Sequence, residues 1–134
     1  MTQNNTNYIW GLQSVSTFNR LHNCTNPHQG TAKRVLCLCS AGLLRSPTTA
    51  VVLQRKFGYN TRAAGVSKDH ALIEVDDVLY NWADEIVAVE QSVAEQVPED
   101  FKEKLIVLSI PDMYPYMNAK LQEIILEQYK KAQT

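Results

Sequence analysis

The sequence has few cysteines, no long hydrophobic segment and no acidic residue before Asp69. Its three cysteines, Cys24, Cys37 and Cys39, are too few for a disulfide framework, and an odd thiol suits a reducing compartment. No apolar run approaches the roughly 20 residues of a membrane span, and the first residues lack the basic and apolar pattern of a secretory signal. These absences predict a cytoplasmic protein that does not enter a membrane.

Charge is unevenly distributed along the chain, although the formal net charge at pH 7 is only -1. That overall balance argues against bulk binding to nucleic acid. The segment before Asp69 could nevertheless face an anionic ligand, unless the two halves of the chain intermix in the fold and cancel. It contains eight basic residues, which are Arg20, Lys33, Arg34, Arg45, Arg55, Lys56, Arg62 and Lys68.

The hydrophobic pattern predicts one compact α/β domain, which a chain of 134 residues is long enough to form. Apolar segments expected to be strands alternate with segments of helical spacing. The expected strands are residues 33–40, 61–64, 85–89 and 105–110, and the expected helical segments are 47–57, 72–82, 92–96 and 118–131. This alternation predicts a three-layer fold, in which a four-stranded parallel sheet has helices on both faces and binds ligands at the carboxyl ends of its strands.

The first 32 residues differ from the rest of the chain, because they are rich in Asn, Gln and Thr. Four apolar residues there have spacings compatible with one helical stripe: Trp10, Val15, Phe18 and Leu21. We therefore expect residues 1–32 to be an N-terminal extension of the domain at 33–134, with a short amphipathic helix at about residues 10–23 packed on it.

The segment that begins at Cys39 has the pattern Cys-x5-Arg, followed by Ser46 and Pro47. It lies where a buried strand should turn into a helix, which Ser46 can cap and whose first turn suits Pro47. Such a turn presents backbone N–H groups and the positive end of a helix to an anion. A thiol, an anion cradle and the Arg45 guanidinium therefore converge, as thiolate attack on a phosphate ester requires.

Each residue of this segment has a predicted role. Cys39 is the candidate nucleophile, and the helix start together with Arg45 would favour its thiolate form. Ser46 could donate a hydrogen bond to the sulfur, and Gly42 allows the positive φ that a ring of inward N–H groups needs. The alternative for Cys39 is a buried and inert cysteine. The expected phosphate-binding residues are Ser40, Ala41, Gly42, Leu43, Leu44, Arg45 and Ser46.

These stretches resemble the low-molecular-weight protein tyrosine phosphatase family, in particular a small branch of predicted phosphatases. The resemblance covers roughly residues 33–131 and rests on residues 35–48, the Ala63-Ala64-Gly65 sequence, residues 82–90 and residues 110–116. It implies a cysteine-dependent phosphatase that acts through a cysteinyl-phosphate. The substrate would be a phosphotyrosine protein or a small phosphate ester, and no cofactor is implied.

The resemblance also implies a general acid far downstream of the nucleophile, and no Asp or Glu precedes Cys39. Asp112 is the candidate, which would protonate the leaving oxygen and then help water to attack the intermediate. Met113 departs from the proline that the family usually has there, and a simple turn residue is the alternative for Asp112. Tyr114 and Tyr116 could wall an aromatic substrate slot, with core packing or turn composition as an equal alternative.

Two other functions are alternatives to a phosphatase. A zinc site could be drawn from His22, Cys24, His28, Cys37 and Cys39, but the spacings match no familiar ligand pattern. A metal on Cys39 would also leave Arg45 without a purpose, so no metal is predicted and Cys37 is expected in the core. The second is a catalytically weak phosphate- or phosphopeptide-binding module, which would keep the cradle but lack a working acid.

Overall fold

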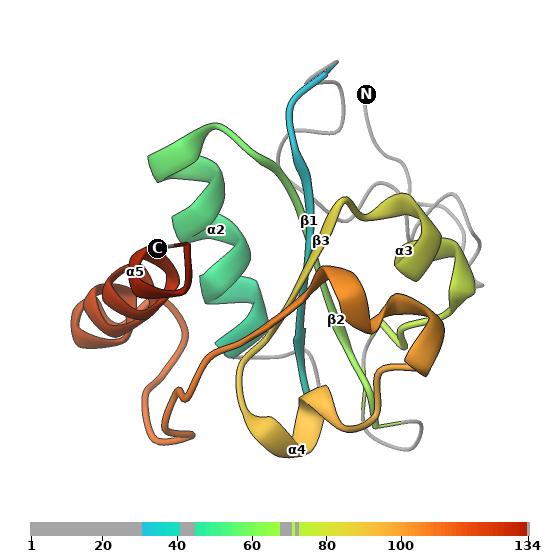
Figure 1. The fold of residues 1–134 in the computed structure, drawn as a ribbon. Helices are drawn as coiled ribbons and strands as arrows, with labels where there is room; N and C mark the ends of the chain where they lie inside the picture. Colours follow the sequence, from blue (N-terminus) through green and yellow to red (C-terminus); the bar gives the residue numbers. More distant parts are fainter. Residues whose placement is uncertain (1–30, 41–44, 68–70, 72, 134) are drawn as a thin grey trace, which may run out of the picture.

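The computed structural model describes residues 31–40, 45–67, 71 and 73–133, which fold around one four-stranded sheet (Figure 1). The strand order is β2-β1-β3-β4, and every neighbouring pair is parallel. The carboxyl ends of the strands therefore lie along one edge of the sheet. The strands are β1 (Arg34–Cys39), β2 (Asn60–Gly65), β3 (Glu85–Ala88) and β4 (Leu105–Val107).

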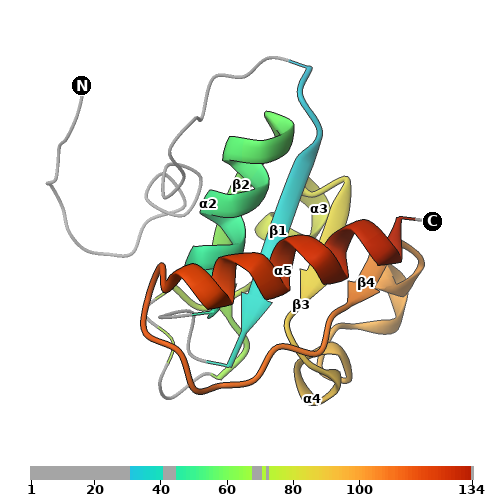
Figure 2. The same ribbon diagram turned by 90° about the vertical axis from the view of Figure 1, so that its left-hand side faces the viewer.

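Helices cover both faces of this sheet, as the alternation of strands and helices predicts. Helices α2 (Arg45–Phe57) and α5 (Ala119–Ala132) lie together on one face, and α3 (Asp77–Trp82) lies on the other (Figures 1 and 2). Helix α3 is joined there by the 3₁₀ helix η1 (Glu99–Lys104), through stacked rings of Tyr80 and Phe101 whose centroids are 5.0 Å apart. The short helix α4 (Gln91–Ala94) lies at the carboxyl end of β3.

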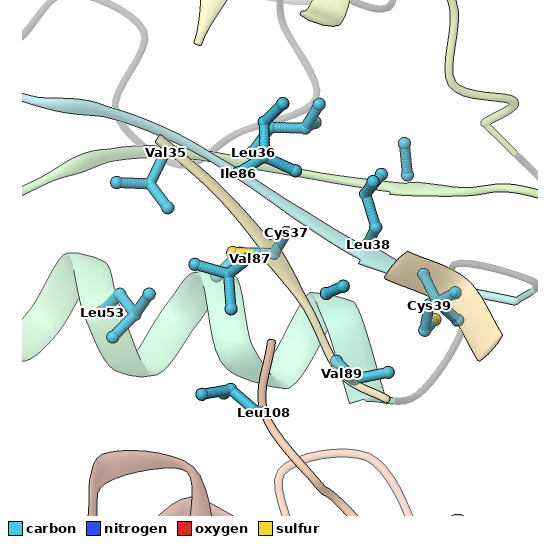
Figure 3. Packing of buried hydrophobic residues seen from close by; sticks show 14 of the residues in the cluster. Val35, Leu36, Cys37, Leu38, Cys39, Leu53, Ile86, Val87, Val89 and Leu108 are labelled. Atoms are coloured by element: carbon cyan, nitrogen blue, oxygen red, sulfur yellow. The ribbon is translucent and has the colours of Figure 1, made fainter. Parts of the chain in front are cut away.

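The two central strands form the core, because both of their faces are covered. Side chains alternate along β1, so Val35 and Cys37 face α2 with Leu53, while Leu36 points to the opposite layer (Figure 3). Fully burying an aliphatic side chain of this size contributes about 1.5 to 3 kcal/mol. The same alternation directs the side chain of Cys39 toward the face covered by α2.

The amino ends of the strands are joined to α5 by a polar cluster. The Tyr129 hydroxyl donates a 2.6 Å hydrogen bond to Glu85 Oε1, and Lys33 Nζ lies 3.0 Å from Glu85 Oε2. Tyr129 is completely buried, and its ring also packs on those of Phe57 and Tyr59. This cluster holds the carboxyl-terminal helix against the sheet at the edge opposite the carboxyl ends of the strands.

One predicted helix is shorter than expected. The helix predicted for residues 72–82 is wrong for residues 73–76, because Glu74 forms an isolated parallel bridge with Gly65. Gly65 N–H donates to Ile73 O and Val75 N–H donates to Gly65 O, each at 2.9 Å. Helix α3 then begins after Asp76, whose side chain accepts a hydrogen bond from Leu79 N–H.

Three further details differ from the sequence predictions. Ser46 is not a helix cap, because α2 already begins at Arg45. The last strand ends at Val107 and is partly exposed, because β4 is an edge strand. Beyond it, Leu108 and Ile110 still donate backbone hydrogen bonds to the end of β3 and the residue after it. The sequence pattern does not predict helix η1.

The predicted amphipathic helix at residues 10–23 lies outside the described residues. The bounds proposed for the extension and the domain therefore stay a prediction. None of the helices in the described part of the chain is long and apolar enough to cross a membrane.

Candidate active site

Cys39 is the last residue of β1, and only 4% of it is exposed. Its Sγ lies 3.1 Å from the hydroxyl of Ser46, which is completely buried in the first turn of α2. The Ser46 hydroxyl also lies 3.4 Å from Ala64 O, to which it can donate. Because a hydroxyl can donate or accept, Ser46 can accept from a Cys39 thiol and can turn to donate to a thiolate.

Backbone hydrogen bonds fix the end of β1 beyond the last strand residue. Cys39 O accepts from Val66 N–H at 3.0 Å, and Ser40 O accepts from Ser67 N–H at 2.8 Å. They position the point where the chain leaves the sheet for α2. Ser40 is exposed there. The other predicted cradle residues, Ala41, Gly42, Leu43 and Leu44, lie outside the described residues, so their role stays a prediction.

Arg45 is the first residue of α2 and is 4% exposed. Its Nη1 donates one hydrogen bond to Glu90 Oε1 and another, 3.0 Å long, to Ile110 O. Its Nε lies 3.6 Å from Asp112 Oδ1. The guanidinium therefore joins three segments that follow the carboxyl ends of β1, β3 and β4.

Glu90 is a further residue at the site, which the sequence motifs do not indicate. It occupies the N-cap position of α4, two residues after β3, and 39% of its side chain is exposed. Its Oε2 accepts a hydrogen bond from the Ser92 hydroxyl. The hydrogen bonds from Ser92 and then Arg45 lower the pKa of Glu90, so it is an anion at neutral pH. The available signal was an acidic residue directly after the predicted strand 85–89.

The segment after β4 brings Asp112 to the site and leaves its aromatic residues in different surroundings. The side chain of Asp112 is 64% exposed, and it forms an ion pair with Arg45. Tyr114 packs partly against the core, whereas Tyr116 is 52% exposed. Met117 N–H donates a 2.9 Å hydrogen bond to Thr48 Oγ1, which ties this segment to α2.

Solved structures share the fold of this chain, although no protein-family model and no curated protein matches the sequence. The tyrosine phosphatase Wzb from Escherichia coli K30, solved with phosphate, has a TM-score of 0.60 and 20% identity over 76% of this chain and 97% of its own. The low-molecular-weight phosphotyrosine phosphatase from Vibrio cholerae O395 has a TM-score of 0.56 and 20% identity, covering 75% and 92%. This is the fold of the low-molecular-weight tyrosine phosphatases.

A third structure with this fold has a different named activity. The YwlE arginine phosphatase from Geobacillus stearothermophilus has a TM-score of 0.58 and 18% identity, covering 75% of this chain and 93% of that one. The resemblance stated from the motifs is thus confirmed for the fold. The low-molecular-weight phosphatase fold therefore occurs in enzymes named for more than one kind of phosphorylated substrate.

At the carboxyl ends of the strands, the structure places Cys39 beside Ser46 and Arg45 beside Asp112, and Arg45 and Ser46 are consecutive residues at the start of α2. Cys37 is completely buried in the core, as expected. Burial, followed by the charges of Glu85 and Cys39, raises the pKa of the Cys37 thiol, which keeps it neutral.

The zinc alternative draws partly on residues that the structure does not describe. His22, Cys24 and His28 lie in the undescribed part of the chain. Among the described residues, no group of three or more His, Cys, Asp or Glu side chains could hold a metal ion.

Proposed function

We propose that this protein is a cysteine-dependent phosphomonoester hydrolase, most similar to protein tyrosine phosphatases. The observation that carries this proposal is that a thiol ends β1 while the next helix begins with a guanidinium that lies beside a carboxylate. Cys39 lies beside Ser46, and Arg45 is the next residue toward the amino end of α2, with Asp112 close to its Nε. The phosphatase fold supports the same conclusion, and Wzb from Escherichia coli K30, which shares that fold, was solved in complex with phosphate.

The first step transfers the phosphoryl group to the protein. The Cys39 thiolate forms a bond to phosphorus while the bond to the ester oxygen breaks, and Asp112 gives its proton to that oxygen. The backbone amides of the 40–45 segment and the Arg45 guanidinium hold the other phosphoryl oxygens. Nε and Nη2 of an arginine present two parallel N–H groups, which match two oxygens of a phosphoryl group.

The second step restores the enzyme. A water molecule attacks phosphorus, Asp112 takes its proton, and the bond to Cys39 Sγ breaks to release phosphate and the thiolate. The Ser46 hydroxyl can donate to the sulfur as negative charge returns to it, because it already lies 3.1 Å away. No electron transfer occurs in either step, so the reaction needs no redox partner.

The rate of the uncatalysed reaction determines how large an acceleration these groups must provide. Phosphate-monoester hydrolysis is among the slowest biological reactions, and enzymes accelerate the slowest cases by up to about 10²¹-fold. A nucleophile alone does not supply this factor. Electrostatic stabilisation by the cradle and Arg45 is expected to be the largest contribution, with proton transfer adding about 10²- to 10⁴-fold.

The test is turnover by a Cys39→Ser variant. We expect it to abolish hydrolysis of an aryl phosphate, because serine is a far weaker nucleophile at neutral pH, while inorganic phosphate or vanadate still binds to the cradle. Cys37→Ala is the matched control, since that buried thiol is held neutral and lies outside the predicted reaction. A panel of phosphotyrosine and phosphoarginine peptides, sugar phosphates and nucleotides then identifies the substrate class.

Two results would contradict the proposal. Cys39→Ser activity above about a tenth of wild type would exclude the covalent intermediate, because the thiolate is essential to it. A wild-type protein that binds phosphate but turns over no member of the panel would instead support the phosphate-binding module.

A further inference from the structure

Met117 ends the segment that carries Asp112, and its backbone conformation is unusual. Its φ is 61°, and in the described part of the chain it is the only residue other than glycine with a positive φ. The Cβ makes this left-handed region unfavourable, and methionine lacks the short polar side chain with which Asn or Asp stabilises it locally. The surrounding structure must therefore hold Met117 in this conformation.

Two side chains from different helices hold the backbone of Met117. Thr48 Oγ1, on α2, accepts a 2.9 Å hydrogen bond from Met117 N–H. Gln122 Nε2, on α5, donates a 2.8 Å hydrogen bond to Met117 O. Thr48 is completely buried, so this acceptor has a fixed position in the fold. Because the N–H and the C=O of Met117 are both bound, the two hydrogen bonds form a clamp on this residue.

The other end of the segment is also attached, close to the proposed reacting groups. Ile110 N–H donates a 2.9 Å hydrogen bond to Val89 O, and Ile110 O accepts from Arg45 Nη1 at 3.0 Å. Between the two attachments, residues 111–116 cross the carboxyl end of the sheet before α5 begins (Figure 2). Asp112 lies in this span, with its Oδ1 3.6 Å from Arg45 Nε. The path of the span is thus determined at both of its ends.

A change in the conformation of Met117 should therefore move Asp112. If Met117 N–H loses its acceptor, φ can return to the negative values that methionine prefers, and the chain before it takes a different direction from α5. Asp112 is largely exposed, so packing of its own side chain does little to oppose such a movement. A general acid must lie within hydrogen-bond reach of the leaving oxygen, and a displacement of about 1 Å can slow a reaction by about 10²-fold.

We propose that Thr48 and Gln122 are positioning residues for the general acid. They hold Met117 in the left-handed conformation, and this keeps Asp112 beside Arg45. The inference rests on the proposed function and extends it to two residues that do not contact the phosphate. Loss of the clamp should slow protonation of the leaving oxygen and leave phosphate binding intact.

The test compares Thr48→Val with Thr48→Ser, using kcat/KM of phosphotyrosine and of an activated aryl phosphate. Valine has the shape of threonine without the acceptor, so we expect about a 10-fold lower kcat/KM for phosphotyrosine, as loss of a hydrogen bond to a partly buried group predicts. The activated ester needs no proton, so its kcat/KM and the inhibition constant of inorganic phosphate should change less than about 2-fold. Serine keeps the hydroxyl and should stay within about 2-fold of wild type for both esters.

Further variants test the same clamp from outside α2. Met117→Val should resemble Thr48→Val, since a β-branched residue is strongly disfavoured at a positive φ. Met117→Gly adopts this φ without cost and should keep the normal dependence on the leaving group. Gln122→Met removes the donor on α5 and should have a smaller effect of the same kind as Thr48→Val. Glu123→Met, at the next and exposed position of α5, is the control and should change neither ester.

Hydrogen exchange of residues 111–118 measures the clamp directly. Exchange there should be faster in folded Thr48→Val than in wild type, and thermal melting checks that each variant is folded. Unchanged exchange, or equal slowing of both esters in Thr48→Val, would overturn the inference. A wild type that hydrolyses neither ester would instead contradict the proposed function, and the exchange measurement would still decide whether the clamp holds this segment.

Discussion

Asp112 is the most exposed of the proposed reacting groups, and its role can be tested through the leaving group. If it is the general acid, Asp112→Asn should slow hydrolysis of phosphotyrosine by about 10²- to 10⁴-fold, because that leaving oxygen needs a proton. An activated aryl phosphate should be slowed much less, since its leaving group departs as an anion. The measurement is kcat/KM of both esters for wild type and variant.

Met113 provides a matched control for this substitution. It is 71% exposed and directly follows Asp112 in the chain. Met113→Ala should change kcat/KM of neither ester much, because no proton transfer depends on this side chain. Equal slowing of both esters by Asp112→Asn, or slowing of neither, would assign the acid to another group.

The site was predictable from the sequence where its residues are close together in the chain. Cys39, Arg45 and Ser46 belong to one strand-to-helix segment, so their spacing alone predicts that they converge. Glu90 is 45 residues from Arg45, and their contact depends on β3 being paired with β1. Sequence patterns predict strands but not which strands are neighbours, and this explains why Glu90 was missed.

At the scale of elements, the segment with Asp112 depends on the start of α5. Asn118 Oδ1 accepts hydrogen bonds from Lys120 N–H at 2.9 Å and from Leu121 N–H at 3.2 Å. Asn118→Ala leaves both donors without this acceptor and should lower the free energy of unfolding by about 1 kcal/mol. Urea unfolding measures the change.

Asn118→Asp is the control for this cap. Its carboxylate accepts the same hydrogen bonds and carries a favourable charge at a helix start, so stability should be retained. If alanine and aspartate were equally destabilising, the side-chain cap would not explain the position.

The predicted elements differ from the structure mainly where a pattern has two interpretations. Val75 fits a helical stripe with Val78, Leu79 and Trp82, but Val75 and Ile73 are β-branched and flank Glu74, which forms an isolated parallel bridge with Gly65. The central strands were predicted well because they are buried on both faces and form continuous apolar runs. The edge strand β4 lacks one neighbour, so its length is decided by pairing with β3 rather than by its own sequence.

At the scale of the whole molecule, the two ends of the sheet carry different groups of polar residues. The carboxyl ends of the strands hold the proposed reacting groups, while Glu85 at the amino end of β3 accepts from Tyr129 on α5. Substitutions of Glu85 or Tyr129 should therefore change the stability of the fold more than the rate of hydrolysis. This separation allows stability to be tested without touching the site.

Buried tyrosines predict how stability depends on alkaline pH. Burial and then the charge of Asp77 raise the pKa of Tyr80 to about 12, and burial and then hydrogen bonds with Glu85 and Tyr59 raise the pKa of Tyr129. Both groups ionise more readily in the unfolded chain, near pH about 10. Their stabilising effect is thus complete below that pH and is lost as pH rises through the window up to the folded values.

We therefore expect the free energy of unfolding to fall above pH about 10, by up to about 1.4 kcal/mol per pH unit for each of the two tyrosines. Urea unfolding across this range measures the slope. Tyr129→Phe should lower stability at neutral pH, because Glu85 loses a donor, and should also make the alkaline slope shallower. Tyr116→Phe, at a half-exposed position, should change neither quantity. A Tyr129→Phe slope equal to that of wild type would mean that Tyr129 does not stay protonated in the folded protein.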